Sequence, residues 1–320
     1  MHANLILAKK EITDAFKNKL FIIILAMLLT LTVVSIVLGS YQVRVAVDNY
    51  NNNVSFLQSL GKTQLPPPPN LNPISASKSF VNYIGMLGAL LSIILGNHAI
   101  AKERRGGTMK LVLSRNVFRD TFLNGKLLGN LGILGLITAL CAAITLVSIP
   151  VIGKVSLTGA DVVRMGWFFV FSFLYMAFFL VLSMTISVFL SKGNKALLVT
   201  IILWLVLAFV FPQIGDTMDM DNQLPGGFFS QMGMTKQQET QVLGKFTFYE
   251  GLRDGIEEMS PTKHYERMNF ALLNVKPGFE ANTALEIIGL KWIDLVGLIA
   301  PSTILWLIAY MAFLRREDIY

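Results

Sequence analysis

The sequence lacks several features that a soluble protein of 320 residues usually has. Only 15% of its residues are charged, against roughly a quarter in soluble domains, while 53% are hydrophobic and the mean hydropathy is +0.58. Its one cysteine, Cys141, excludes a disulfide within the chain and any zinc or iron–sulfur site built on several thiolates. The chain also lacks the G-x-x-x-x-G-K-[ST] phosphate-binding loop. The composition therefore indicates a membrane protein without an ATP site of this kind.

Long apolar runs predict the membrane spans. A bilayer core about 30 Å thick needs roughly 20 apolar residues per helix. Six runs meet this requirement: Leu20–Gly39, Val81–Ala101, Leu127–Ile152, Gly166–Leu190, Ala196–Ile214 and about Leu295–Leu314. The predicted fold is all-α and integral to the membrane, with six transmembrane helices. Basic residues precede the first run, as in a signal peptide, but no Ala-x-Ala-like cleavage site follows it, so we expect a retained helix.

The net charge of +7 predicts an orientation. With the N-terminus inside, the cytoplasmic segments hold 15 basic and six acidic residues, and the outer segments hold 12 and 14. Because Lys and Arg collect on the cytoplasmic side of membrane proteins, both termini are predicted to be cytoplasmic, with the chain in the inner (cytoplasmic) cell membrane. The basic pI is then a consequence of topology, and no nucleic-acid partner is expected.

The segments outside the spans differ in character. In residues 1–19, apolar positions at helical spacing predict an amphipathic elbow helix in the membrane interface, with an unstructured basic tail as the alternative. Spans one to five occupy 20–214, with a polar outer loop at 40–80 that contains the polyproline run Pro66–Pro69. Residues 215–294 form an extracytoplasmic segment long enough for several helices. Span six and a cytoplasmic C-terminus follow at 295–320.

The most informative segment is the cytoplasmic loop 102–126. Gly106 and Gly107 permit a sharp reversal after span two, because glycine tolerates positive φ. Thr108 can cap a short helix whose apolar positions include Leu111 and Leu113. A short helix with an apolar face can dock into a groove on a soluble partner.

This loop resembles the coupling loop of ABC transporter permeases of the ABC type-2 exporter class. The matching positions are Glu103, Arg104, Gly107, Thr108, Leu111, Leu113, Ser114, Arg119, Gly125 and Lys126. The predicted ATPase-coupling interface comprises Glu103, Arg104, Arg105, Gly107, Thr108, Leu111, Leu113, Ser114 and Arg119. The family usually has a proline just after the serine, where Arg115 and Asn116 stand here. The opening stretch AKKEITDAFKNKLFIIIL resembles the interfacial elbow of the branch that includes the nitrous-oxide-reductase maturation permease.

The resemblance implies a permease subunit without catalytic activity of its own. Two such subunits, identical or related, would form the pore in the lipid bilayer, and each would dock a cytoplasmic ABC ATPase through this loop. The ATPase would bind ATP and magnesium, and this chain would bind no cofactor. An apolar span five would suit a lipid-like or hydrophobic peptide cargo. The alternatives are a non-transporting membrane anchor or sensor driven by an ATPase and, with little support from polar residues in the spans, an integral-membrane enzyme.

Two further residue sets are candidates. Span two carries a face of small residues, Gly85, Gly88, Ser92 and Gly96, which predicts close helix packing within the subunit or, alternatively, a subunit seam or translocation path. The outer segment contains Met218, Met220, Met232, Met234 and His264, which are ligand types suited to Cu(I). Methionine also fills apolar cores, and this is the interpretation we favour over a metal site.

Overall fold

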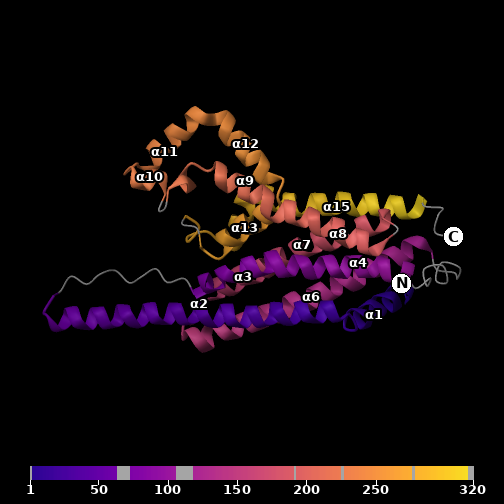
Figure 1. Ribbon diagram of the computed structural model, residues 1–320. Coiled ribbons are helices and arrows are strands. Elements are labelled where there is room, and N and C mark those ends of the chain that lie inside the picture. Colours follow the sequence, from indigo (N-terminus) through magenta and orange to yellow (C-terminus); the bar gives the residue numbers. More distant parts are fainter. Residues whose placement is uncertain are drawn as a thin grey trace.

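The computed structural model describes residues 2–62, 73–105, 118–190, 192–224, 227–275 and 278–315, and these contain helices and no strand (Figure 1). Six segments are long and apolar enough to cross a membrane: Lys19–Ser59, Pro73–Arg104, Arg119–Gly153, Gly159–Phe189, Gly193–Met218 and Trp292–Arg315. The predicted all-α membrane fold with six spans is confirmed. Four of the spans are the single helices α2 (Lys19–Ser59), α6 (Arg119–Gly153), α7 (Gly159–Phe189) and α15 (Trp292–Arg315).

The other two spans each contain a short π-helical turn. Span two runs through the 3-10 turn η1 (Pro73–Ser77), α3 (Lys78–Tyr83), the π turn η2 (Ile84–Gly88) and α4 (Ala89–Arg105). Span five consists of α8 (Gly193–Leu205), the π turn η3 (Val206–Val210) and α9 (Phe211–Met218). Pro212 sits in the first turn of α9 and does not end the span, although a proline inside a helix is expected to break it. The π turn just before Pro212 changes the local hydrogen-bond pattern, and the helix continues.

The core of the bundle forms around α7. Its side chains Phe168, Tyr175 and Phe179 are fully buried, and Phe80 of α3 packs its ring against Phe168 and Phe169. α4 lies along α7, and α15 and α6 also contact it. A span with so many buried aromatic residues belongs in the middle of a bundle, because a helix that is apolar all round is suited to burial.

The predicted outer loop 40–80 is helical over about its first half. α2 continues to Ser59, and Figure 1 shows it projecting well beyond the other spans. With 41 residues, it measures about 60 Å, roughly twice the thickness of a bilayer core. Neither glycine nor proline occurs between Tyr41 and Leu60, so nothing in the backbone stops the helix where the hydrophobicity stops. Pro66–Pro69 lie outside the described residues.

The predicted elbow is the helix α1 (His2–Ala15), but it buries a different face from the one its apolar pattern indicates. Glu11 and Ala15 are buried, whereas Ile12 and Phe16 are 41% and 46% exposed. α1 packs against α6. The protein-facing side therefore combines the small residues Ala8 and Ala15 with Glu11, which meets a charged partner, whereas Lys9 and Lys10 are exposed. Ile12 and Phe16 face outward, as expected for a helix lying in the bilayer interface.

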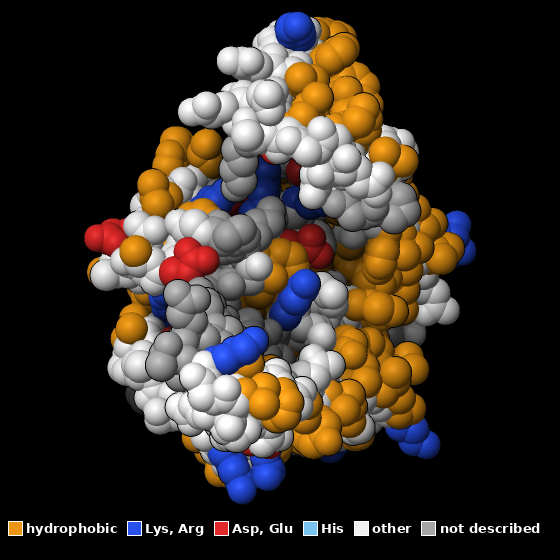
Figure 2. All heavy atoms as spheres, turned by 90° about the vertical axis from the view of Figure 1, so that its left-hand side faces the viewer, with side chains coloured by type: hydrophobic (Ala, Val, Ile, Leu, Met, Phe, Trp, Pro, Cys, Tyr) orange, Lys and Arg blue, Asp and Glu red, His pale blue; other side chains and the backbone are white. Residues whose placement is uncertain are grey.

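The segment between spans five and six is helical, and its parts lie in two places. α10 (Phe228–Gln231), α11 (Lys236–Leu243) and α12 (Thr247–Glu258) form an arch away from the bundle (Figure 1). α13 (Pro261–Leu272) returns to contact α7 and α15, and α14 (Ala284–Leu290) leads into span six. Tyr265 of α13 stacks on Tyr175 of α7 at a centroid distance of 4.5 Å. Figure 2 shows the end of the molecule that carries the arch, where acidic and basic side chains both line a central hollow.

Candidate coupling site at the foot of the loop

A buried cluster of charges joins three helices at the end of the molecule where the N-terminus lies. Glu11 comes from α1, Glu103 from the last turn of α4, and Lys126 from the second turn of α6. All three side chains are at most 4% exposed. Glu103 and Lys126 flank the segment 106–117, which lies outside the described residues. The cluster therefore sits where the loop leaves the bundle and where it returns.

The contacts in this cluster are short. The Lys126 ammonium donates to Glu103 Oε1 at 2.8 Å and also to Glu11 Oε1. Lys10 donates to the same Glu103 oxygen at 2.5 Å. Asn130, one turn beyond Lys126, donates to Glu11 Oε2 at 3.3 Å. Two lysines thus face two carboxylates, so the four charges balance. This pairing compensates for the burial of Glu11, Glu103 and Lys126, while Lys10 stays 43% exposed.

Burial and charge act in opposite directions on these groups. Burial raises the pKa of Glu11, and the charge and hydrogen bond of Lys126 oppose that rise without cancelling it. For Lys10, burial lowers the pKa, but the hydrogen bond and charge of Glu103 outweigh it and leave the pKa raised. The bridge to Glu103 therefore stabilises the charged form of Lys10.

A glycine lets α1 lie close to α6. A Cβ atom at Gly129 would fall 2.9 Å from both Ala8 Cα and Glu11 Cβ, which is closer than such atoms normally approach. The absence of a side chain at this position brings Glu11 within reach of Lys126 and Asn130. Closer to the protein surface, Lys102 of α4 pairs with Asp14 of α1 at 2.9 Å. α1 is thereby attached to both α4 and α6.

Two arginines tie the ends of the loop to other spans. The Arg104 guanidinium donates to the carbonyls of Ser187 and Leu190 at 3.1 and 2.7 Å, so it caps the C-terminal end of α7. A cation there is favoured by the helix dipole. Arg119, the first residue of α6, donates to Leu314 O near the end of α15 at 3.1 Å. The two ends of the loop are therefore connected to α7 and α15 as well as to α1.

The predicted docking residues thus fall into two groups. Glu103, Arg104 and Arg119 make contacts inside the bundle. Gly107, Thr108, Leu111, Leu113 and Ser114 lie outside the described residues, as does the side chain of Arg105, so docking through them stays a prediction. The sequence did not single out Lys10, Glu11 or Asn130, nor Phe118, which precedes α6 and is 78% exposed. Charged residues are common at the ends of spans, so no local signal indicated that Glu11 would pair with Lys126.

The small residues of span two face α7. Cβ atoms at Gly88 and Gly96 would meet Met176 Sδ at 3.2 Å and Leu180 O at 2.5 Å. Ser92 is buried and donates to Gly88 O, and Gly85 O accepts from the Tyr175 hydroxyl at 2.8 Å. These four residues therefore lie at a contact inside the subunit, where the π turn η2 exposes a carbonyl that a regular helix would use itself.

The outer methionines and His264 occupy different surroundings. His264 Nδ1 lies 2.8 Å from Asp294 Oδ1, and Nε2 lies 3.0 Å from Glu258 O, so both ring nitrogens have protein partners. Met232 is 61% exposed, and Met218 lines a surface hollow. Met220 and Met234 lie in the turns beside α9 and α10. This placement gives His264 a structural role between α13 and α15, and a copper site here remains only the less favoured sequence-based possibility.

Asp294 is a buried acidic residue at the start of α15. It is 4% exposed, and Arg267 Nε lies 3.1 Å from the same oxygen that faces His264. Its carboxylate therefore fastens α13 to the start of α15. A Cβ atom at Gly297 would collide with the His264 ring, so this contact too depends on a glycine.

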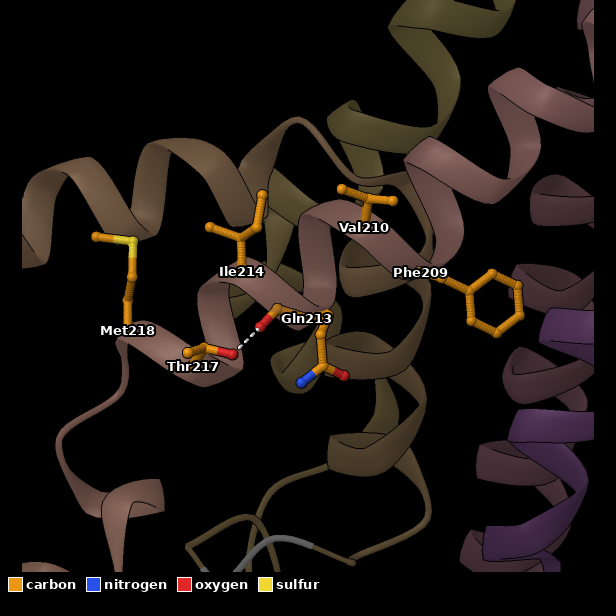
Figure 3. Close-up of a pocket in the computed structure, with 6 residues that line it drawn as sticks. All are labelled: Phe209, Val210, Gln213, Ile214, Thr217 and Met218. Atoms are coloured by element: carbon orange, nitrogen blue, oxygen red, sulfur yellow. Dashed lines mark hydrogen bonds between the residues drawn. The ribbon is translucent and has the colours of Figure 1, made fainter.

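Span five carries a hollow at its α9 end. Phe209, Val210, Gln213, Ile214, Thr217 and Met218 line a space of about 480 Å³ (Figure 3). A neighbouring space of about 640 Å³ shares Gln213 and Thr217 and adds Asp216, Asn222 and Gln223. Apolar and polar linings thus meet along one helix, with Gln213 and Thr217 at the boundary.

The comparison with protein families identifies one match over nearly the whole chain. A family model described as "ABC-2 family transporter protein" matches residues 5–318. The match includes α1, both ends of the loop and all six spans. A search of curated proteins found no match.

Proposed function

Because the chain belongs to the ABC-2 family of transporter proteins, we propose that this permease subunit couples ATP hydrolysis by a separate cytoplasmic ABC ATPase to export of a cargo. The observation that carries the proposal is the charge cluster at the foot of the loop, in which Glu11, Glu103 and Lys126 are buried and the partly exposed Lys10 pairs with Glu103. A loop that transmits a movement of the ATPase needs a stiff attachment to the helices it moves. The cluster supplies one, because paired charges in a buried site are costly to separate.

The proposed path of motion starts at the loop and passes from α4 and α6 to three neighbouring helices. Glu103 and Lys126 connect its ends to α1, Arg104 to α7, and Arg119 to α15. A shift of the loop would then tilt α4 and α6 together, with α1 following in the plane of the interface. Phe118, exposed beside the loop, is an apolar group that an ATPase could cover.

The remaining parts of the proposal concern orientation and assembly. The distribution of Lys and Arg favours cytoplasmic termini in the inner (cytoplasmic) membrane. In the structure, α1, the ends of the loop and the C-terminal end of α15 lie together, opposite the arch α10–α12 (Figure 1). A second permease subunit would complete the pore. ATP and magnesium would bind to the ATPase, with no cofactor on this chain.

The hollow on span five supports a lipid-like or hydrophobic peptide cargo. Its wall is mostly apolar, and the adjoining wall is polar, which suits a molecule with an apolar body and a polar end. This is a proposal about chemical class, and it rests on one face of α9.

The test is reconstitution of the subunit with its ATPase in vesicles. ATP-dependent movement of a fluorescent phospholipid or an apolar peptide, abolished by replacement of Gly107 or Leu111 without loss of membrane insertion, would support the proposal. ATP hydrolysis that is stimulated by the permease and unaccompanied by movement of either probe would favour the alternative of a non-transporting anchor. Loop variants that retain full ATPase binding and transport would refute docking through this loop.

A further inference from the structure

A pocket lies between the end of the elbow, the starts of spans one and five, and the last turns of span two. Its space is about 380 Å³, and it is lined by Lys17, Asn18, Lys19, Leu20, Ile94, Asn97, His98, Asn194 and Leu197. This pocket shares no lining residue with the charge cluster of Glu11, Glu103 and Lys126. We propose that it binds the headgroup of one anionic phospholipid, with the acyl chains running along Leu20 and Leu197.

The cations are the first argument. Lys17 and Lys19 both line the pocket, and neither has a carboxylate partner among the described residues, in contrast to Lys10, Lys102 and Lys126. Two lysines without counter-ions on one side of a pocket attract a phosphate. Where α1 meets α4 and α6, the lysines are neutralised by Glu11, Asp14 or Glu103. Lys17 and Lys19 differ from those lysines because no carboxylate among the described residues neutralises them.

Helix ends add to the positive potential. α2 begins at Lys19, with Asn18 as its cap, and α8 begins at Gly193, next to Asn194. Both helices therefore direct their N-terminal, partly positive ends toward the pocket. Asn18 caps α2 by accepting from the N–H groups of Leu20 and Phe21. At α8, the side chain of the N-cap residue Lys192 makes no capping hydrogen bond.

The apolar wall argues for a lipid over a free phosphate. Leu20 is 57% exposed, and Ile94 and Leu197 are half-buried beside it. Leu20 belongs to the first turn of span one and Leu197 to the second turn of span five, so both lie where a membrane helix enters the bilayer. A headgroup bound at Lys17 and Lys19 would place its acyl chains against these side chains. A basic pocket between membrane helices at the interface is the recognised setting for an anionic headgroup.

The test measures lipid binding to the purified full-length chain by native mass spectrometry, with phosphatidylglycerol and phosphatidylcholine as probes. The wild type should retain phosphatidylglycerol in preference to phosphatidylcholine. The K17Q/K19Q variant should bind phosphatidylglycerol roughly 30-fold more weakly, on the basis of about 1 kcal/mol per lysine. The K9Q/K62Q variant removes the same charge from two exposed lysines outside the pocket and should change the affinity less than about threefold.

Three results would overturn the proposal. Equal losses in the two variants would show that only diffuse surface charge attracts the lipid, and an unchanged K17Q/K19Q affinity would remove the pocket from consideration. Displacement of the lipid by excess inorganic phosphate, with no contribution from chain length when dihexanoyl and dioleoyl phosphatidylglycerol are compared, would indicate a site for free phosphate. Thermal unfolding of each variant checks that it is folded. The assay contains no ATPase, so its outcome is independent of the transport function.

Discussion

Glu103 of α4 accepts a hydrogen bond from Lys126 of α6 at 2.8 Å, and both side chains are about 2% exposed. These residues flank the loop through which the permease is proposed to meet its ATPase. The salt bridge closes the loop at its base, and Lys10 of α1 reaches the same carboxylate oxygen. The contact therefore joins the elbow and two spans at one point.

Removal of the Glu103 charge should loosen the whole site. The Glu103→Gln variant leaves Lys10 and Lys126 with one carboxylate between them, and we expect the free energy of unfolding to fall by about 3 kcal/mol. The permease should also stimulate its ATPase less. Thermal unfolding in detergent and an ATPase assay measure the two effects. As a control, Asp48→Asn removes an exposed partner of Arg44 and should cost less than about 1 kcal/mol.

The pairing of Lys126 with Glu11 can be tested by a double-mutant cycle. Lys126→Met or Glu11→Leu alone leaves a buried charge short of its partner, and each should be strongly destabilising. The double variant should be less destabilised than the sum of the two, by about 1–3 kcal/mol, because it removes both charges. Additive losses in chemical unfolding would show that the two side chains are not coupled.

The close approach of α1 depends on Gly129. Gly129→Ala places a Cβ atom against the backbone of Ala8, and we expect a loss of about 1–3 kcal/mol with displacement of the elbow. Gly132→Ala, on the same helix with open space around it, is the matched control. It should be neutral or stabilising by up to about 1 kcal/mol, because alanine favours the helix. Hydrogen exchange of α1 would locate the effect, and similar behaviour of the two variants would contradict the packing.

Arg104 should be required for its geometry as well as its charge. Arg104→Met removes the cation at the end of α7 and should cost about 2 kcal/mol. Arg104→Lys keeps the charge but cannot reach several carbonyls at once, so it should restore only part of the loss. Hydrogen exchange at Ser187 to Leu190 should rise in both variants. Full recovery by lysine would mean that the charge alone is important.

Phe118 should contribute to ATPase binding and hardly at all to folding. At 78% exposure, its replacement by alanine should change the free energy of unfolding by less than about 0.5 kcal/mol. Co-purification of the ATPase should fall by about tenfold if the ring is covered in the complex. Phe248→Ala alters an 85% exposed ring on α12, in the arch, and should leave ATPase binding unchanged. Equal binding by the two variants would exclude Phe118 from the interface.

The spans and their order were readable from the sequence, whereas their details were not. Hydropathy predicted all six spans because the bilayer requires long apolar runs and each run is a local property of the chain. Hydropathy did not predict that α2 continues to Ser59. The helix persists beyond the apolar run because no glycine or proline interrupts the polar residues that follow it. The face that α1 buries was also missed. Its apolar side chains Ile12 and Phe16 face outward, because a bilayer surrounds the protein and the polar Glu11 finds its partners inside.

By itself, the sequence determined that this protein is helical, crosses a membrane six times and carries its excess positive charge on one side. Composition and run length suffice for these conclusions, because water and lipid act on each segment separately. Only the tertiary structure decided that Glu11, Glu103 and Lys126 meet, since Glu11 and Lys126 are separated by 115 positions and their pairing depends on how α1, α4 and α6 pack. It also decided which lysines of the elbow have carboxylate partners and which face the pocket, because charge pairing depends on position in space.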